Sequence, residues 1–216
     1  MAAKVRNIII NENMKPGDRL PSEGELVTLF GVSRPTIREA MKLLKAENII
    51  EIQRGRGTFV SEQTGIVKDP LGLGFTDQYN LLENLLEARL IIEPPITFLA
   101  AQRASESNLN TLEEIVTKMK VLHTQAISNT ELDMEFHTII ALSSQNVILH
   151  RVVPIINDSI INGYGETLNN IESFQRAVKS HIKIFNAIKD KDPLTARYEA
   201  EKHIRQTLDD VKRTKT

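Results

Sequence analysis

Four side chains in the C-terminal half of the chain have the types and the spacing of a metal-ligand set. Asp133 and His137 are four residues apart, so on a helix they project from one face. His181 and His203 each lie eleven residues from position 192, where the last two predicted helices meet, so in an antiparallel pair they have the same height. One carboxylate and three imidazoles suit zinc foremost, and also nickel, manganese or iron. We therefore predict that these four residues bind one divalent metal ion.

The predicted ligands also imply a pH dependence. Imidazole coordinates a metal only as the neutral base, so protons compete with the ion. Metal occupancy should fall as the pH drops toward and below about 6, near the pKa of a free histidine. The other two histidines, His123 and His150, have no comparable partners in the pattern, and we expect them to be surface or structural residues.

Arg89 is a further residue whose position predicts chemistry. It shares a helical face with Leu82, Leu86 and Ile96, so its guanidinium should point inward and require an anion. Glu93, one turn later, is one candidate, and the pair would then be structural. The other candidate is the carboxylate of a bound ligand, which the planar fork of an arginine binds well.

The elements that must position these side chains form a helical bundle. Apolar spacing after residue 76 predicts a helix that begins near Leu82, is disturbed at Pro94-Pro95 and resumes through Ala100-Ala101. Five more helices are expected, over 106–127, 131–143, 146–168, 170–190 and 193–213. Six consecutive helices indicate an antiparallel bundle.

The first sixty residues predict a different kind of unit. Ser22 and Glu25 have the spacing of a capping box, and Ser33 can cap the next helix. The runs 49–52 and 58–60 read as two strands around a glycine-rich turn. Two helices linked by a turn and followed by a hairpin make a winged helix-turn-helix. The fold class is therefore mainly α, with a winged helix-turn-helix domain over 1–62, a linker over 63–76 and an all-helical domain over 77–216.

The winged helix carries the side chains of a DNA-reading surface. Arg34 and Arg38 lie on one face of the third helix, opposite its apolar stripe, where an arginine fork can reach guanine in the major groove. Ser33 and Thr36 can reach phosphate. The wing adds two cations and two glycines that allow close approach to the duplex, namely Arg54, Gly55, Arg56 and Gly57. Residues 1–60 carry a net charge of +3 against −4 for the remainder, as expected for a nucleic-acid module joined to a second unit.

Motifs in this region closely resemble the N-terminal domain of GntR-family transcription regulators. They are PGDRLPSE at 16–23, FGVSR at 30–34, TIREA at 36–40 and GRGTFV at 55–60. The resemblance implies a transcription regulator that binds double-stranded DNA. Because one recognition helix covers only a few base pairs, we expect a homodimer on a palindromic operator.

The second part of the chain resembles the FCD effector domain of the FadR/VanR subfamily. The matching segments are LLENLLEARLIIEP at 81–94, AAQRA at 100–104 and DMEFH at 133–137, followed by Asn146, His181 and His203. The resemblance implies that a small carboxylic acid binds over the metal and controls operator affinity. It further implies that Arg89 receives the acid's carboxylate, with help from Asn146.

Composition narrows the classes that remain. The chain has no cysteine, which excludes disulfides, thiolate metal sites and cysteine nucleophiles. Its longest apolar runs are too short to span a membrane, and no export signal is recognised, so we expect a cytoplasmic protein without membrane contact. A metal-dependent enzyme acting on a small acid, or a constitutive DNA-binding dimer with a purely structural helical domain, are the alternatives to a sensor.

Overall fold

The buried apolar side chains form two separate cores, one in each of two units of the chain. The computed structural model describes residues 1–62, 64–65, 69–73, 80–168 and 171–214, without the side chains of 162–168 and 214. The units comprise Met1–Gly74 and Phe75–Thr216. The predicted linker, 63–76, lies mostly outside the described residues.

The first unit is the winged helix-turn-helix that the sequence predicts. Leu26, Ile37, Met41 and Leu44 are among the side chains of its core. Its elements are α1 (Ala2–Asn11), α2 (Glu23–Phe30), α3 (Arg34–Ala46) and the antiparallel strands β1 (Ile50–Gln53) and β2 (Gly57–Val60).

Local capping fixes where the two central helices begin and end. The Ser22 side chain accepts a hydrogen bond from the Glu25 backbone, and the Glu25 carboxylate accepts one from the Ser22 backbone at 2.7 Å, which confirms the capping box. α2 ends at Gly31, whose φ of 63° reverses the chain at little steric cost. Ser33 then caps α3 by accepting from the backbone of Thr36. The turn between α2 and α3 is therefore short and closely defined.

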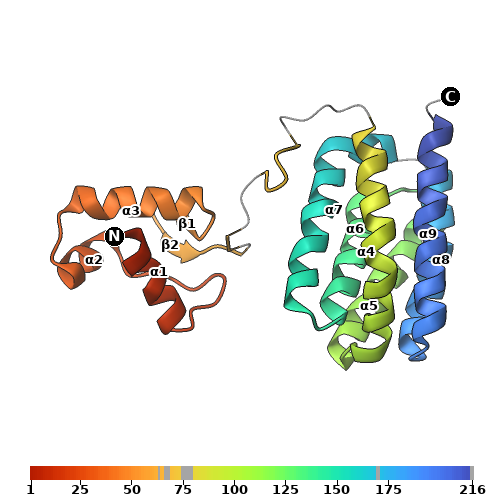
Figure 1. The fold of residues 1–216 in the computed structure, drawn as a ribbon, viewed down its shortest axis with the longest axis horizontal. Helices are drawn as coiled ribbons and strands as arrows, with labels where there is room; N and C mark the ends of the chain where they lie inside the picture. The colour runs from red at the N-terminus through yellow and green to blue at the C-terminus, as the bar shows by residue number, and fades with distance from the viewer. Residues whose placement is uncertain (63, 66–68, 74–79, 169–170, 215–216) are drawn as a thin grey trace. The chain divides into compact units, whose positions relative to one another are not determined.

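The second unit is an all-helical bundle, as predicted (Figure 1). In it α4 packs against α9, α8 against α9, and α6 against α7. None of the described helices is long and apolar enough to cross a bilayer. The helices are α4 (Leu81–Arg103), α5 (Glu106–Thr124), α6 (Thr130–Ser143), α7 (Val147–Leu168), α8 (Ile171–Lys189) and α9 (Pro193–Thr214).

The expected disturbance at Pro94-Pro95 is wrong, because α4 runs through both prolines without a break. Each proline removes one N–H, which leaves the carbonyls of Leu90 and Ile91 without their helical donors. Ile91 is 75% exposed, so water can hydrate the carbonyl on that side. Packing of α4 against its neighbours offsets the remaining cost of the lost hydrogen bonds. This packing cannot be predicted from a local sequence pattern.

Candidate metal centre and nucleic-acid interface

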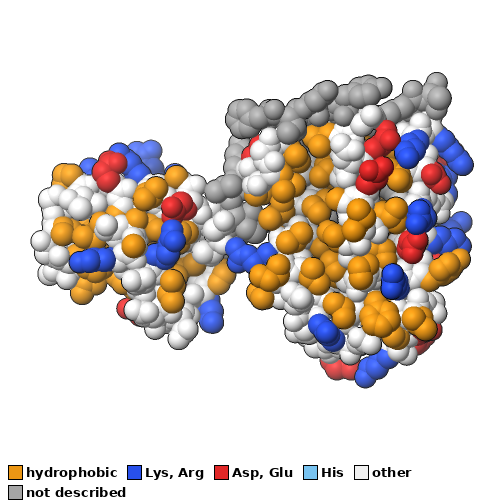
Figure 2. All heavy atoms as spheres, viewed as in Figure 1, with side chains coloured by type: hydrophobic (Ala, Val, Ile, Leu, Met, Phe, Trp, Pro, Cys, Tyr) orange, Lys and Arg blue, Asp and Glu red, His pale blue; other side chains and the backbone are white. Residues whose placement is uncertain are grey.

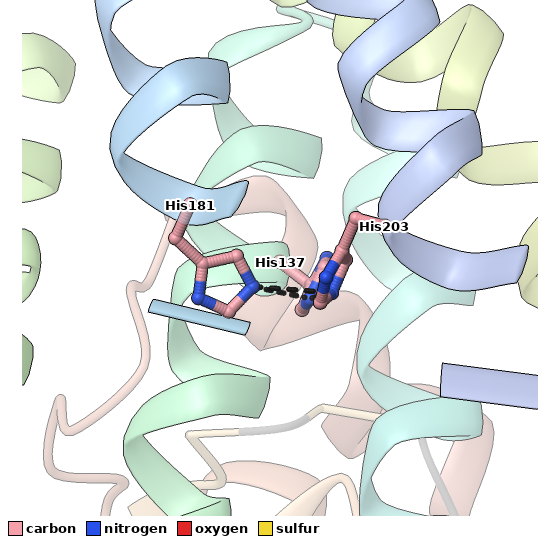
Figure 3. Close-up of side chains that lie close together, drawn as sticks. All are labelled: His137, His181 and His203. Carbon is pink, nitrogen blue, oxygen red and sulfur yellow. Dashed lines mark hydrogen bonds between the residues drawn. The ribbon is translucent and has the colours of Figure 1, made fainter. Parts of the chain in front are cut away.

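Three histidines from three different helices converge inside the second unit. His137 comes from α6, His181 from α8 and His203 from α9, and all three are buried. Their Nε2 atoms lie 3.3 Å (137 to 181), 3.2 Å (181 to 203) and 3.3 Å (137 to 203) apart. Figure 3 shows the three rings pointing toward one another. Three of the four ligands predicted from spacing therefore meet at one point.

This triangle of nitrogens has the dimensions of a metal site. Its centre lies about 1.9 Å from each Nε2 atom, which is close to the zinc–nitrogen distance of about 2.0–2.1 Å. Neutral imidazoles cannot satisfy all three contacts as hydrogen bonds, because each Nε2 atom is either a donor or an acceptor and two of the three must have the same role. A shared cation satisfies all three lone pairs at once, so the residues present fit a divalent metal.

A buried carboxylate orients the first of these ligands. Nδ1 of His137 lies 2.8 Å from the Glu93 carboxylate, and Glu93 also accepts hydrogen bonds from Arg89 through Nε at 2.5 Å and Nη2 at 3.3 Å. In the neutral ring, donation through Nδ1 leaves Nε2 of His137 with only a lone pair, which is the form that binds a metal. The sequence pattern identifies Glu93 as a partner for Arg89 but gives no sign of its contact with His137.

Electrostatics keep these groups in metal-binding protonation states. Burial, followed by the charges of His203 and His137, holds the pKa of His181 well below its usual 6.5. Burial, followed by the charges of His137 and Arg89, lowers the pKa of His203 in the same way. Both rings are thus neutral at pH 7 without the ion.

The carboxylates respond in opposite ways to the same surroundings. Burial alone would raise the pKa of Glu93, but the charges of Arg89 and His137 and the hydrogen bonds they donate hold it well below its usual range. Burial raises the pKa of Asp133, although the charges of His137 and Arg89 oppose the rise. Glu93 therefore remains ionised beside His137 across the physiological range.

Asp133 lies beside the three histidines rather than among them. Its Oδ1 is 3.6 Å from Nε2 of His181, and the compact group of ligand atoms in the described residues contains only the histidines. A small cleft reaches this side of the cluster and is lined by Asp133, Met134 and His203 among others. A ligand from outside can consequently approach the histidines from the side of Asp133.

Neither Arg89 nor Asn146 lines this cleft. Arg89 is fully buried, and its fork is occupied by Glu93 and, at 3.6 Å, by the sulfur of Met134. Asn146 precedes α7, and its side-chain oxygen accepts from the backbone N–H groups of Ile148 at 3.0 Å and Leu149 at 3.3 Å. These contacts account for both residues without a ligand.

Asn157 is a buried polar residue that the sequence analysis missed. Its Nδ2 donates to the carbonyl of Met134 and to the hydroxyl of Thr138, both at 3.1 Å, which ties α7 to the helix that carries His137. The signal that could have indicated it is an asparagine at the end of the apolar run VVPII at 152–156. His123 and His150, which we expected outside the centre, are half-buried and lie outside the histidine cluster.

Replacement of Glu93 tests the support of His137. Glu93→Gln preserves the shape of the side chain but removes the negative charge that makes the His137 imidazole a better metal ligand. It should therefore weaken zinc affinity by about 10–100-fold. Competition with a chromogenic chelator measures this affinity. Glu113→Gln is the matched control, since Glu113 forms an exposed ion pair with Lys189, and it should bind zinc as the parent does. Equal affinities of the two variants would contradict the role of Glu93.

The second candidate site is the exposed face of α3 in the first unit. Arg34 and Arg38 are exposed, while Ile37 and Met41 on the other face are buried, as the helical spacing predicts. Arg38 donates through Nε to the carboxylate of Glu23 at 3.2 Å, a contact between α3 and α2 that the sequence did not indicate. The Ser33 and Thr36 hydroxyls are 2.8 Å apart at the helix start. The N-terminal end of α3 thus presents two cations and two hydroxyls to solvent.

The wing presents its cations in a three-residue turn between β1 and β2. Arg54, Gly55 and Arg56 are exposed, and Gly55 has a φ of +75°. Gly57 has a different reason to lack a side chain: its φ is +127°, and a Cβ atom there would lie 3.0 Å from Nε of Arg19. Gly57 therefore leaves room for Arg19 to pack against the wing. This is a second role beside the close approach of the wing to DNA.

Comparison with known proteins agrees with this division into two units. Residues 1–60 match the profile described as bacterial regulatory proteins, gntR family, and residues 84–206 match that of the FCD domain. The HTH-type transcriptional regulator LutR of Bacillus subtilis is 29% identical over 187 residues, which cover 84% of this chain and 85% of that protein.

Further relatives extend the similarity to the whole chain. The galactonate operon transcriptional repressor of Escherichia coli is 28% identical over 190 residues, covering 85% of this chain and 83% of its own length. A solved structure of a Streptococcus agalactiae GntR protein superposes with a TM-score of 0.81 at 32% identity and covers 97% of each chain. The same fold and a similar sequence thus occur together in a solved structure.

Proposed function

The chain belongs to the gntR family of bacterial regulatory proteins, and we propose that its second unit, an FCD domain, senses a small carboxylic acid at a metal ion held by three histidines. The protein is a DNA-binding transcription regulator, and its relatives are regulators rather than enzymes. The convergence of three Nε2 atoms carries the metal part of the proposal. A protein of this kind acts on chromosomal DNA, so we place it in the cytoplasm.

The metal is held by His137, His181 and His203, and Asp133 is the fourth protein ligand or borders the position that an acid takes. When bound, the ion attracts carboxylate and hydroxyl oxygens, which makes it the anchor for an effector. Zinc is the first candidate, because its usual distance to a histidine nitrogen is about 2.0–2.1 Å, and nickel, manganese and iron are the others. The E. coli relative is named for galactonate, an acid, which supports this effector class.

Our expectation that Arg89 receives the effector directly is not supported by the contacts it makes. Its guanidinium is occupied by Glu93, and it does not line the cleft beside Asp133. We propose instead that Arg89 acts through Glu93, which in turn orients His137. Asn146 likewise supports the effector site only by fixing the start of α7.

The experiment that tests the function couples acid binding to DNA binding. The full-length protein first selects a duplex from a random-sequence pool, and its affinity for that duplex is then measured with and without small hydroxy acids such as glycolate and lactate. A sensor should change its DNA affinity by about 5–150-fold in the presence of an effector acid. Binding of acid without any change in DNA affinity, or turnover of the acid, would contradict the proposal and favour a constitutive dimer or an enzyme.

We propose that the regulator works as a homodimer assembled through its second unit. Figure 2 shows hydrophobic side chains gathered over α4 and α7. On these two helices, Ile91 of α4 is 75% exposed and Val147 of α7 is 70% exposed. Gathered apolar side chains at the surface mark an interaction site. Pairing of such faces places two winged helices on one duplex, as a palindromic operator requires.

Arg38 is expected to read a base pair of the operator. Arg38→Ala should cost about 1–3 kcal/mol at that base pair and relax specificity there, because a guanidinium fork matches O6 and N7 of guanine. Fluorescence anisotropy with the selected duplex and its single-base variants measures both effects. Lys42→Ala is the control, since Lys42 lies further along α3 and pairs with Glu39.

The same assay tests the dimer. A duplex with only one half-site should bind much more weakly than the palindrome, because the second winged helix then has only nonspecific contacts.

If Arg38→Ala binds selected and random duplexes with the same affinities as the parent, Arg38 does not read a base.

A further inference from the structure

A pocket of about 270 Å³ lies between the wing and the start of α2 in the first unit. We call it the wing pocket. Its walls come from three segments, within 19–23 at the start of α2, 52–55 at the end of β1 and 57–58 at the start of β2. A water molecule takes about 30 Å³, so the wing pocket has room for a group of several heavy atoms.

Main-chain hydrogen bonds fix the segment that carries Arg19 into this pocket. Arg19 forms an antiparallel bridge with Phe59, and the backbone N–H of Leu20 donates to the carbonyl of Thr58 at 2.8 Å. The segment before α2 thus lies along β2 as a short additional strand. Side chains alternate between the two faces of a strand, and Leu20 is buried in the core, so Arg19 projects to the exposed face.

The guanidinium of Arg19 lies against the backbone of the wing. A Cβ atom at Gly57 would be 3.0 Å from Nε and 3.4 Å from Nη2 of Arg19, so the absence of a side chain at Gly57 leaves the space that the guanidinium occupies. Arg54, in the turn of the wing, lines the same pocket and is exposed. The guanidinium of Arg19 is therefore held at the wing by its surroundings rather than by a carboxylate.

The two arginines of the wing pocket have donors to spare. In the part of the chain that the structure describes, neither Arg19 nor Arg54 forms an ion pair or a side-chain hydrogen bond. Glu23 also lines the pocket, but its carboxylate accepts from Arg38 at 3.2 Å. Together these four side chains are three cations and one carboxylate, a net charge of +2. The planar fork of an arginine matches the oxygens of a phosphate, so the pocket suits a phosphate group.

The wing pocket adjoins the side chain that we expect to read a base. Glu23 belongs to its wall and contacts Arg38, so a single carboxylate connects the pocket with the exposed face of α3. A duplex that receives a recognition helix in its major groove has a phosphate backbone on each side of that groove. We therefore expect one of these backbones to pass beside the wing pocket when Arg38 reaches its base pair.

We propose that the wing pocket binds one phosphate group of the operator backbone, with Arg19 and Arg54 as its ligands. The sequence analysis assigned Arg54 to DNA contact but gave Arg19 no role. Such a contact sets the position of the duplex against the wing and carries no base specificity. The inference rests on the DNA-binding activity of the first unit and is independent of the acid sensor in the second.

Duplexes with a single neutral phosphate locate the contact. In a series of the selected duplex, one phosphate at a time is replaced by an uncharged methylphosphonate, and the affinity of the full-length protein is measured by fluorescence anisotropy. At the position that occupies the wing pocket, the parent should bind about 10-fold more weakly, because charge-assisted hydrogen bonds are lost. Arg19→Gln should bind the unmodified duplex about 10-fold more weakly, and the same methylphosphonate should then cost less than about threefold.

Three further variants assign the effect to the wing pocket. Arg54→Gln should reproduce the result of Arg19→Gln at the same phosphate. Arg19→Lys should recover part of the affinity, because it keeps the charge without the planar fork. Arg6→Gln is the matched control, since Arg6 is an arginine of the same unit that pairs with Glu47, and it should keep the full penalty at that phosphate.

A structural role of Arg19 predicts a different result. If Arg19 only supported the wing, Arg19→Gln would weaken binding to every duplex by the same factor and retain the methylphosphonate penalty, which would overturn the proposal. If Arg19→Gln lowers the melting temperature, Arg54→Gln decides the outcome by the same criterion.

The contact with the backbone is separable from the reading of a base. Arg19→Gln should discriminate among base pairs at the position read by Arg38 within about twofold of the parent, because phosphate contacts do not carry sequence information. A loss of this discrimination would mean that Arg19 acts through α3, and it would overturn the phosphate site while the DNA-binding function stands.

Discussion

The double variant His181→Ala/His203→Ala should purify without zinc, whereas the parent protein should carry one ion per chain. Removal of two of three converging nitrogens leaves His137 as the only histidine ligand, which cannot compete with water for the ion. Each single variant should also lose most of its metal. Elemental analysis of the dialysed proteins measures the difference.

The same ion should contribute strongly to the stability of the helical unit. A ligand present at 1,000 times its dissociation constant stabilises the folded state by about 4 kcal/mol, so a chelator should lower the melting temperature of the parent and not that of the double variant. The winged helix has its own core and should keep its fold in all variants. His123→Ala/His150→Ala is the matched control with two histidines removed, and it should retain its zinc. Full retention of zinc by His181→Ala/His203→Ala would contradict the assignment of these histidines as metal ligands.

Acid should release the metal at a lower pH than the sequence predicts. Burial holds the pKa values of His181 and His203 well below 6.5, so protons compete with zinc only in that lower range, rather than from about 6. In the unfolded chain the same histidines bind protons near pH 6.5. The unfolded state therefore carries more protons below this pH, and the metal-free protein should lose stability as the pH falls through and below 6.5. Thermal melts of chelator-treated protein between pH 8 and pH 5 measure this loss.

Arg89→Met should strongly destabilise the second unit. It leaves the Glu93 carboxylate buried with the His137 ring as its remaining partner, and loss of one partner of a buried pair costs about 3–5 kcal/mol. The melting temperature should fall by roughly 10 °C. Thermal and urea unfolding followed by circular dichroism measure the change.

A second Arg–Glu pair at the same spacing provides the control. Arg205 pairs with Glu201 on the exposed side of α9, so Arg205→Met should cost at most about 1 kcal/mol. Replacement of both buried partners, Arg89→Met/Glu93→Leu, should recover much of the stability, because no uncompensated charge remains. Its zinc affinity should stay low, since His137 has lost its acceptor. Equal stability of the Arg89→Met and Arg205→Met variants would show that the buried pair is not needed.

Much of the fold and of the candidate sites could be predicted from the residues alone. Helical periodicity placed Arg34 and Arg38 opposite the buried stripe of α3, because the faces of a helix follow from 3.6 residues per turn. The capping box at Ser22 depends only on contacts within four residues. The equal heights of His181 and His203 followed from the symmetry of two antiparallel helices about one turn, and the structure brings their Nε2 atoms to 3.2 Å.

Tertiary packing decided what lies between the helices. The spacing put Asp133 and His137 on one face, but the rotation of α6 against α8 and α9 brings only His137 into the cluster. The pattern left Arg89 with two possible anions, and its contact with Glu93 lies within α4. The packing of α4 against α6 then brings Glu93 to His137, which the pattern did not indicate. The ion pair between Arg176 and Asp210 joins residues 34 apart in the chain. Helical periodicity fixes the direction in which a side chain points from the axis of its own helix. Its contacts with other helices depend on how the helix axes are placed and rotated, and no local sequence pattern contains this information.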